Sequence, residues 1–170
     1  MIRSFTEKTL NKLLTEINEC KLDKRPLDHT FFKKIGKYIS NYEVPPPLDE
    51  NVEDYLESLL EWPRRNLFTY GTLMPGEAHH KILAPWIGLW QKGYSKGNLY
   101  SMGWGVDYGL PAMKWDPQGQ DIPGYLFISK QLDWQVLDNF EGAQYQRIWV
   151  LVMVDDKVLS VANAYQGLMK

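Results

Sequence analysis

The sequence predicts an α+β protein in which helices precede a small, mainly antiparallel β-sheet or barrel with short helices of its own. Three observations predict this fold class. Apolar residues recur at helical intervals up to about residue 60, short aromatic segments interrupted by glycines begin at residue 66, and residues 148–165 have the pattern of a hairpin. We therefore expect a helical N-terminal extension over residues 1–65 and an α+β domain over residues 66–170.

Three helices are expected in the extension. The first should begin at residues 4–7, Ser-Phe-Thr-Glu, which have the spacing of a capping box. Asp28 is expected to cap the second, which the prolines at residues 45–47 must end. The third should begin near Asn51 and stop before Pro63. The residues expected to face inward are Leu10, Leu13, Leu14 and Ile17, then Phe31, Phe32, Ile35 and Tyr38 or Ile39, and finally Val52, Tyr55, Leu56, Leu59 and Leu60.

The remainder of the chain predicts short strands. Residues 66–70 form a β-prone aromatic segment that Gly71 interrupts, so a strand should lead into a loop there. Residues 86–100 predict extended chain whose glycines suit bulges or close backbone approach. A further strand is expected over residues 124–128.

A short helix and a hairpin should complete the domain. Ser129 is expected to cap the helix, with Leu132, Val136 and Leu137 facing inward and an end near Phe140. Residues 148–154 and 158–165 should then pair as strands around an Asp-Asp-Lys turn.

Composition narrows the classes of function. A single cysteine, Cys20, permits no internal disulfide, and the adjacent His79 and His80 diverge on a helix or strand, so no metal and no cofactor are expected. A net charge of −2 gives no footprint for nucleic acid. No apolar run approaches the roughly 18–20 residues that span a bilayer, so we expect no membrane segment and a cytoplasmic location. A small-molecule or protein partner remains, and the oligomeric state stays open.

The segment after the first expected strand has the form of an anion-binding turn. Residues 68–76, Phe-Thr-Tyr-Gly-Thr-Leu-Met-Pro-Gly, run into a glycine turn where consecutive backbone N–H groups can point at one carboxylate. Gly71 and Gly76 have the interval of a phosphate-binding loop, but Glu77 and Ala78 stand where that loop needs Lys and Ser or Thr. The alternative is that Gly71 merely turns the chain.

Residues 137–147, Leu-Asp-Asn-Phe-Glu-Gly-Ala-Gln-Tyr-Gln-Arg, are the second segment that can carry chemistry. Aromatic neighbours would raise the pKa of Glu141 by desolvation, whereas contact with Arg147 would lower it, so its protonation is left open. The alternative is an ordinary surface carboxylate at a helix end. No serine or cysteine stands in a recognisable nucleophile elbow, which argues against an acyl-enzyme.

Taken together, the two segments resemble the γ-glutamylcyclotransferase-like family. Its members begin their domain with a strand ending in Tyr-Gly-Thr-Leu, and they carry Leu-Asp, then Phe or Tyr, then Glu-Gly and Tyr-x-Arg before the final strands. The corresponding residues here are 70–73, 137–138, 140–142 and 145–147, and the middle of the chain agrees at 97–100, 110–112 and 122–126. The resemblance covers about three-fifths of the chain and leaves residues 1–65 unexplained.

The resemblance implies an enzyme that works by intramolecular cyclisation, a γ-glutamylcyclotransferase of acyltransferase or lyase type without a cofactor. The α-amine of a γ-glutamyl amide would attack its own side-chain carbonyl and release 5-oxoproline and a free amine. Glu141 corresponds to the family's catalytic glutamate, a general acid and base. For Arg147, the alternatives to binding substrate are orienting Glu141 and a structural ion pair. The substrate-binding positions that the resemblance implies are Tyr70, Gly71, Thr72, Leu73, Tyr145 and Arg147.

Two readings of function remain open. The first is the enzyme, acting on free γ-glutamyl amino acids, glutathione-like peptides, γ-glutamyl-lysine remnants of crosslinked protein or acyl-carrier intermediates. The second is a non-catalytic binding or regulatory module whose helical extension docks a partner, although such a module has no need for Glu141. The extension can also be a lid over the pocket or a dimer interface. Among the tryptophans, Trp104, set among glycines, is favoured to stack on a ligand.

Overall fold

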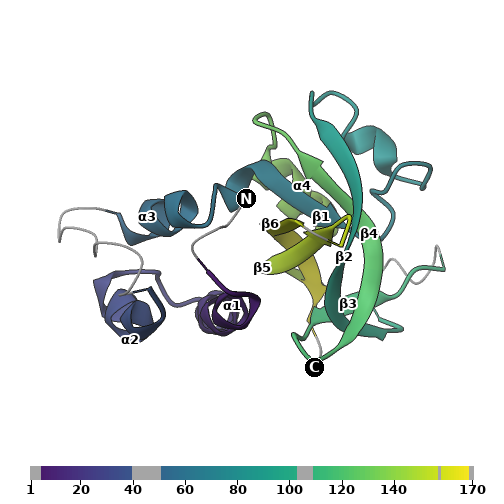
Figure 1. The fold of residues 1–170 in the computed structure, drawn as a ribbon. Coiled ribbons are helices and arrows are strands. Elements are labelled where there is room, and N and C mark those ends of the chain that lie inside the picture. The colour runs from purple at the N-terminus through teal and green to yellow at the C-terminus, as the bar shows by residue number, and fades with distance from the viewer. Residues whose placement is uncertain (1–4, 40–50, 103–108, 157, 169–170) are drawn as a thin grey trace.

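The structure, a computed structural model, describes residues 5–39, 51–102, 109–156 and 158–168. It confirms the predicted class: helices lie beside a small, mainly antiparallel barrel, as Figure 1 shows. The helices are α1 (Glu7–Leu22), α2 (His29–Ile39), α3 (Val52–Leu59) and α4 (Trp134–Glu141), with 3-10 turns η1 (Pro63–Arg65) and η2 (His80–Ile82). The strands are β1 (Asn66–Thr69), β2 (Leu89–Tyr100), β3 (Ala112–Trp115), β4 (Gln120–Ile128), β5 (Tyr145–Val154) and β6 (Val158–Gly167).

The first three helices form where they were predicted. Asp28 accepts a hydrogen bond from the Phe31 N–H at 3.0 Å, and Asn51 caps α3. The expected cap of α1, Ser4, lies outside the described residues, and Thr6 caps the helix instead by accepting from the Thr9 N–H at 3.1 Å. Of the residues expected to face inward, Tyr38, Tyr55 and Leu59 are partly buried. The fully packed ones are Leu10, Leu13, Leu14, Ile17, Phe31, Phe32, Ile35, Ile39, Val52, Leu56 and Leu60.

Five strands close into the barrel. The order along the sheet is β3-β2-β4-β1-β6-β5, and a further pairing of β2 with β5 closes the ring, with β3 attached outside it to β2. The β1–β6 pair is parallel, and the other pairs are antiparallel. Closure brings backbones together at Gly93, where an added Cβ would lie 2.7 Å from the Met153 carbonyl oxygen. The glycine spacing in residues 86–100 therefore marked a close approach, as predicted.

Three local predictions need correction. The N-cap of α4 is Asp133, which accepts from the N–H groups of Gln135 and Val136, because the Ser129 hydroxyl instead donates to the Ile87 carbonyl at 2.6 Å. Val136 points outward, with 44% of its surface exposed, whereas Leu137 is buried as expected. Strand β3 was not predicted, and β4 begins earlier than the expected residues 124–128.

Helix α1 lies against the edge of β5 that β6 leaves free. Strand β5 pairs with β2 at residues 152–154, and at Trp149 the side chain of Asn18 takes the place of a neighbouring strand. The Asn18 amide donates to the Trp149 carbonyl at 2.7 Å and accepts from the Trp149 N–H at 3.0 Å. Asn18 is buried, so water could not replace its side chain as the hydrogen-bond partner of the Trp149 N–H and C=O groups.

A single hydrophobic core continues from the helices into the barrel. It joins the inward faces of α1, α2 and α3 to residues of the strands, among them Ile148, Val150 and Val161. A second cluster, which includes Leu67, Leu137 and Tyr165, lies beneath α4. The division into an extension and a domain at residue 65 stays a prediction, but α1 to α3 and the barrel bury apolar surface against each other.

No helix within the described ranges combines the length and the apolar character that crossing a membrane requires.

Replacing Asn18 tests the anchoring of α1. We expect Asn18→Leu to leave the buried N–H and C=O of Trp149 without partners, which lowers the free energy of unfolding by about 2–4 kcal/mol. Urea denaturation monitored by tryptophan fluorescence measures the change. Asn11→Ala, two turns earlier on α1 and at a partly exposed position, is the control and should stay within about 0.5 kcal/mol of the parent. A loss below about 1 kcal/mol for Asn18→Leu would contradict the anchoring role.

Candidate functional site

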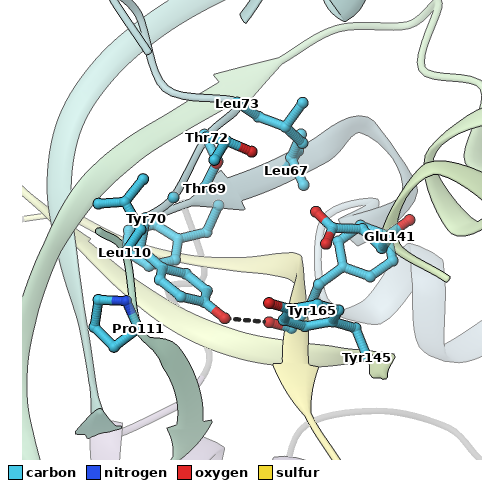
Figure 2. Close-up of a pocket in the computed structure, with 12 residues that line it drawn as sticks. Leu67, Thr69, Tyr70, Thr72, Leu73, Leu110, Pro111, Glu141, Tyr145 and Tyr165 are labelled. Carbon is cyan, nitrogen blue, oxygen red and sulfur yellow. Dashed lines mark hydrogen bonds between the residues drawn. The ribbon is translucent and has the colours of Figure 1, made fainter. Parts of the chain in front are cut away.

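The sequence-predicted glycine turn and Glu141 lie on one cavity. It occupies the space between the end of β1, the turn that follows and the end of α4, and it has an empty volume of about 440 Å³ that is partly open to solvent. Figure 2 shows the two sides, with Tyr70 and Thr72 facing Glu141, Tyr145 and Tyr165. The lining residues are Leu67, Phe68, Thr69, Tyr70, Gly71, Thr72, Leu73, Leu110, Pro111, Glu141, Tyr145 and Tyr165.

The turn after β1 lines this cavity with Gly71, Thr72 and Leu73. Within the turn the carbonyls of Gly71 and Thr72 accept from the N–H groups of Met74 and His79, at 3.1 and 2.9 Å. Among the described residues, no backbone carbonyl accepts from the N–H groups of Gly71, Thr72 or Leu73. The space beside Gly71 is open, because a Cβ there would meet nothing within 4 Å. Binding of an anion by these N–H groups stays a prediction, and the open space beside the turn is compatible with it.

His79 and His80 stabilise the conformation of the turn through contacts with neighbouring residues. The Nδ1 atom of His80 lies 3.0 Å from the Leu73 carbonyl oxygen, and the His79 ring packs against Phe140 of α4 with centroids 5.1 Å apart. The turn is thereby fixed against the helix that carries Glu141. Among the residues that the structure describes, no group of three or more His, Cys, Asp or Glu is placed to hold a metal ion.

Tyr70 lines the cavity with its ring while its hydroxyl ties three strands together. The hydroxyl donates to the Tyr165 carbonyl of β6 at 2.6 Å and accepts from the Met113 N–H of β3 at 3.0 Å. Burial raises the pKa of Tyr70 well above its ordinary value, so the phenol stays neutral. Its donor hydrogen is committed to the protein, and the ring is therefore the part of Tyr70 that a ligand would meet.

Glu141 is the last residue of α4, and Gly142, at a φ of 77°, ends the helix immediately after it. Burial raises the pKa of Glu141 from 4.5 to about 7. The sequence left open whether desolvation or an arginine would set this value, and desolvation dominates because the arginine is engaged elsewhere. A carboxyl group with a pKa near 7 is suited to take up and release a proton at neutral pH.

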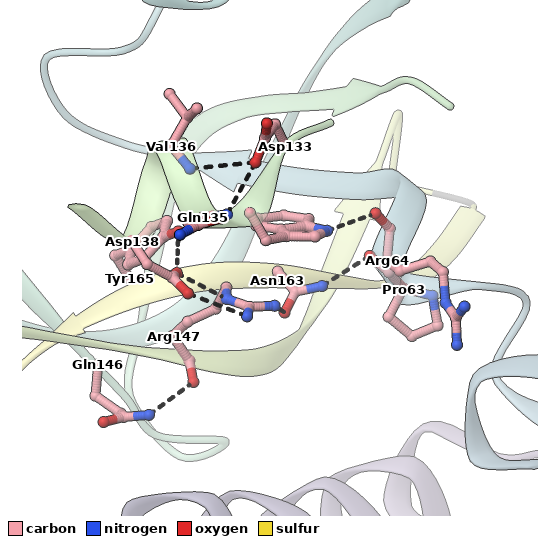
Figure 3. A network of polar contacts seen from close by, with 11 residues as sticks. Pro63, Arg64, Asp133, Gln135, Val136, Asp138, Gln146, Arg147, Asn163 and Tyr165 are labelled. Atoms are coloured by element: carbon pink, nitrogen blue, oxygen red, sulfur yellow. Dashed lines mark hydrogen bonds and ion pairs between the residues drawn. The ribbon is translucent and has the colours of Figure 1, made fainter. Parts of the chain in front are cut away.

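Arg147 pairs with Asp138 and lies outside this cavity. Its Nε and Nη2 atoms are 2.9 and 3.2 Å from the two carboxylate oxygens of Asp138, a bidentate geometry that Figure 3 shows. The Tyr165 hydroxyl donates to Asp138 at 2.6 Å, and Arg147 also donates to Asn163 at 3.3 Å. This network fixes α4 on β5 and β6. Binding of substrate by Arg147 stays a prediction, and the geometry favours its structural alternative.

Six lining residues were absent from the predicted site: Leu67, Phe68 and Thr69 of β1, Leu110, Pro111 and Tyr165. Tyr165 comes from the last strand, where alternating apolar residues gave no sign that it would reach the cavity. Leu110 and Pro111 precede β3, and the sequence offered them as part of the family resemblance and not as site residues. Tyr145, at the start of β5, lines the cavity as predicted. Trp104 lies outside the described residues.

Comparisons with known proteins agree with the fold. The chain is similar to the crystal structure of an AIG2-like protein from Mus musculus, with 19% sequence identity, a TM-score of 0.50 and coverage of 62% of this chain and 78% of that one. It is also similar to YkqA from Bacillus subtilis, at 25% identity and a TM-score of 0.50 over 62% of this chain and 36% of that one. The search of curated proteins finds no match.

A family match covers both halves of the site. The family described as γ-glutamyl cyclotransferase, AIG2-like, matches residues 67–167, which include the glycine turn, α4 and the strands that hold them together. Residues 5–39 and the helix α3, which complete the hydrophobic core, lie outside the match. On this match over more than half of its length, the chain belongs to the AIG2-like γ-glutamyl cyclotransferase family.

Proposed function

We propose that the protein cyclises a γ-glutamyl amide, releasing 5-oxoproline and a free amine, with Glu141 as general acid and base. The observation that carries the proposal is the cavity that a carboxyl group of pKa about 7 shares with the turn of Gly71, Thr72 and Leu73. Such a site can bind a negative charge on one side and move a proton on the other.

The reaction needs the substrate folded upon itself. The α-nitrogen forms a bond to the γ-carbonyl carbon, and the bond from that carbon to the leaving nitrogen breaks, so the reacting groups belong to one molecule. The enzyme contributes by holding the folded conformer, for which a narrow cavity with aromatic walls, Tyr70, Tyr145 and Tyr165, is suited.

Glu141 would carry the proton between the two nitrogens. As a carboxylate it takes a proton from the α-nitrogen, and as a carboxylic acid it delivers that proton to the leaving nitrogen. The α-ammonium loses its other proton to solvent and the leaving amine gains one there, so the charges balance. A pKa near 7 leaves both forms of Glu141 populated at neutral pH.

The turn after β1 would bind charge on the substrate. The backbone N–H groups of Gly71, Thr72 and Leu73 are assigned to the α-carboxylate or to the oxyanion that develops on the γ-carbonyl, where fixed dipoles need no reorganisation. The Tyr145 hydroxyl is assigned as a further substrate contact, since Tyr145 lines the cavity beside Glu141. Arg147 would act through Asp138 by holding α4 in place.

Removing the acid-base group tests the assignment directly. We expect Glu141→Gln to lower the rate of 5-oxoproline release by roughly a hundred- to ten-thousand-fold, because an amide cannot shuttle the proton. Release is measured by chromatography over a panel of γ-glutamyl amino acids, γ-glutamyl-lysine and glutathione. Glu77→Gln, at an exposed position of the same turn, is the matched control and should retain the parent rate. Equal rates for parent and Glu141→Gln would disprove the role of Glu141.

The pH dependence of stability tests the raised pKa without any substrate. Between pH 4.5 and about 7 the folded protein keeps a proton on Glu141 that the unfolded chain releases, so rising pH destabilises the parent over this window. Glutamine resembles the protonated carboxyl and escapes this penalty. We therefore expect the Tm of Glu141→Gln to rise relative to that of the parent from pH 5 to pH 8 and to level off above it. A difference that does not change with pH would mean that the carboxyl group is not desolvated.

A further inference from the structure

A second pocket adjoins the first and takes one wall from the N-terminal helices. The two pockets share Tyr145 and Tyr165, and the second has an empty volume of about 720 Å³ that includes open solvent. Lys21, from the last turn of α1, reaches it from outside the residues matched by the family, 67–167. Its lining residues are Lys21, Asp138, Gly142, Tyr145, Gln146, Arg147 and Tyr165.

Lys21 is a half-buried cation without a close counter-ion. Its ammonium lies 4.7 Å from the centre of the Trp149 ring, and the C-terminal end of α1 also favours a positive charge. Among the described residues, no carboxylate oxygen lies within 4.0 Å of it; Glu53 and Glu57 attract it from farther away. Burial lowers the pKa of Lys21, which shows that this attraction does not offset its desolvation.

The other cation of the second pocket is already neutralised. Arg147 holds Asp138 through two hydrogen bonds, so the pair contributes little net charge to the pocket wall. The positive charge that remains for a ligand is that of Lys21. A ligand carboxylate near its ammonium would supply the missing counter-ion in a setting where water is partly excluded.

Glu141 lines the first pocket close to its boundary with the second. Gly142, which follows Glu141 directly, lines the second pocket, and Tyr145 lies on the boundary between them. In the proposed function the leaving nitrogen must lie beside Glu141 to receive its proton. The part of the leaving amine beyond that nitrogen would then extend past Gly142 and Tyr145 toward Lys21, which lines the second pocket.

We propose that the second pocket holds the leaving amine and that Lys21 recognises a carboxylate on it, so that the substrate class is γ-glutamyl amino acids in preference to uncharged γ-glutamyl amines. The inference rests on the proposed function and deepens it. It also gives the N-terminal helices a role at the site, because α1 supplies the residue that determines specificity.

Two substrates of matched shape separate this proposal from the cyclisation itself. γ-Glutamyl-alanine carries a carboxylate on its leaving group, and γ-glutamyl-alaninamide carries a neutral amide in its place. We expect the parent to prefer the first in kcat/KM, and Lys21→Met to reduce that preference by roughly 3- to 10-fold through KM, the range of a partly exposed ion pair. Lys21→Arg should retain most of the preference. Lys12→Met, an equal charge change at an exposed position of α1, should not alter it.

The possible results separate the role of Lys21 from the cyclisation itself. Turnover of both substrates with the same preference in parent and Lys21→Met overturns the assignment of Lys21 and leaves the cyclisation standing. No 5-oxoproline from either substrate, while γ-glutamyl-lysine or glutathione is turned over, overturns this inference alone, and none from the whole panel overturns the proposed function with it. Should Lys21→Met fail to fold, Lys21→Gln and the effect of salt on the parent decide: KM for γ-glutamyl-alanine must rise more steeply with ionic strength than that for γ-glutamyl-alaninamide, and equal salt dependence overturns the assignment.

Discussion

The contact between Asn18 and Trp149 is the constraint on which the rest of the arrangement depends. An unpaired strand edge exposes N–H and C=O groups that must find partners or water, and here a helix provides them through one buried amide. The contact sets α1 on β5, and β5 carries Arg147 and Tyr145 two and four residues before Trp149. One helical turn after Asn18, Lys21 reaches the second pocket. Fold and site are therefore linked through a single strand.

The electrostatics of the site follow from where the charges are paired. Arg147 is close enough in sequence to be a partner for Glu141, yet its hydrogen bonds go to Asp138 and Asn163. Burial raises the pKa of Glu141, while Asp138 on the same helix pairs with Arg147. Two acidic residues three positions apart on one short helix thus have different surroundings, since Glu141 lines the cavity and Asp138 is paired with an arginine.

The sequence predicted best those features that depend on residues close together in the chain. Apolar residues at helical spacing identified α1 to α3, since burial of one face is what stabilises such helices. The N-caps could not be predicted as exactly, because two residues suited to cap a helix lie within a few positions of each other. Thr6 caps α1 and Asp133 caps α4. Ser129 does not cap α4, since its hydroxyl donates to the Ile87 carbonyl, a contact that only the tertiary structure creates. Glu141 and the glycine turn were found through the family resemblance. Lys21 and Tyr165 were not found, because their place at the site arises from contacts between segments far apart in the chain.

The shortness of α4 has a consequence for how the carboxyl group is held. A helix of eight residues has little stability of its own in water, so its geometry is imposed by the strands and the turn that surround it. The side chain of Asp138 and the ring of Phe140 attach it to the barrel and to the glycine turn, respectively. The position of Glu141 is therefore fixed by elements on opposite sides of the cavity. A change that loosens either attachment would displace the Glu141 carboxyl group even if every residue in contact with it stayed the same.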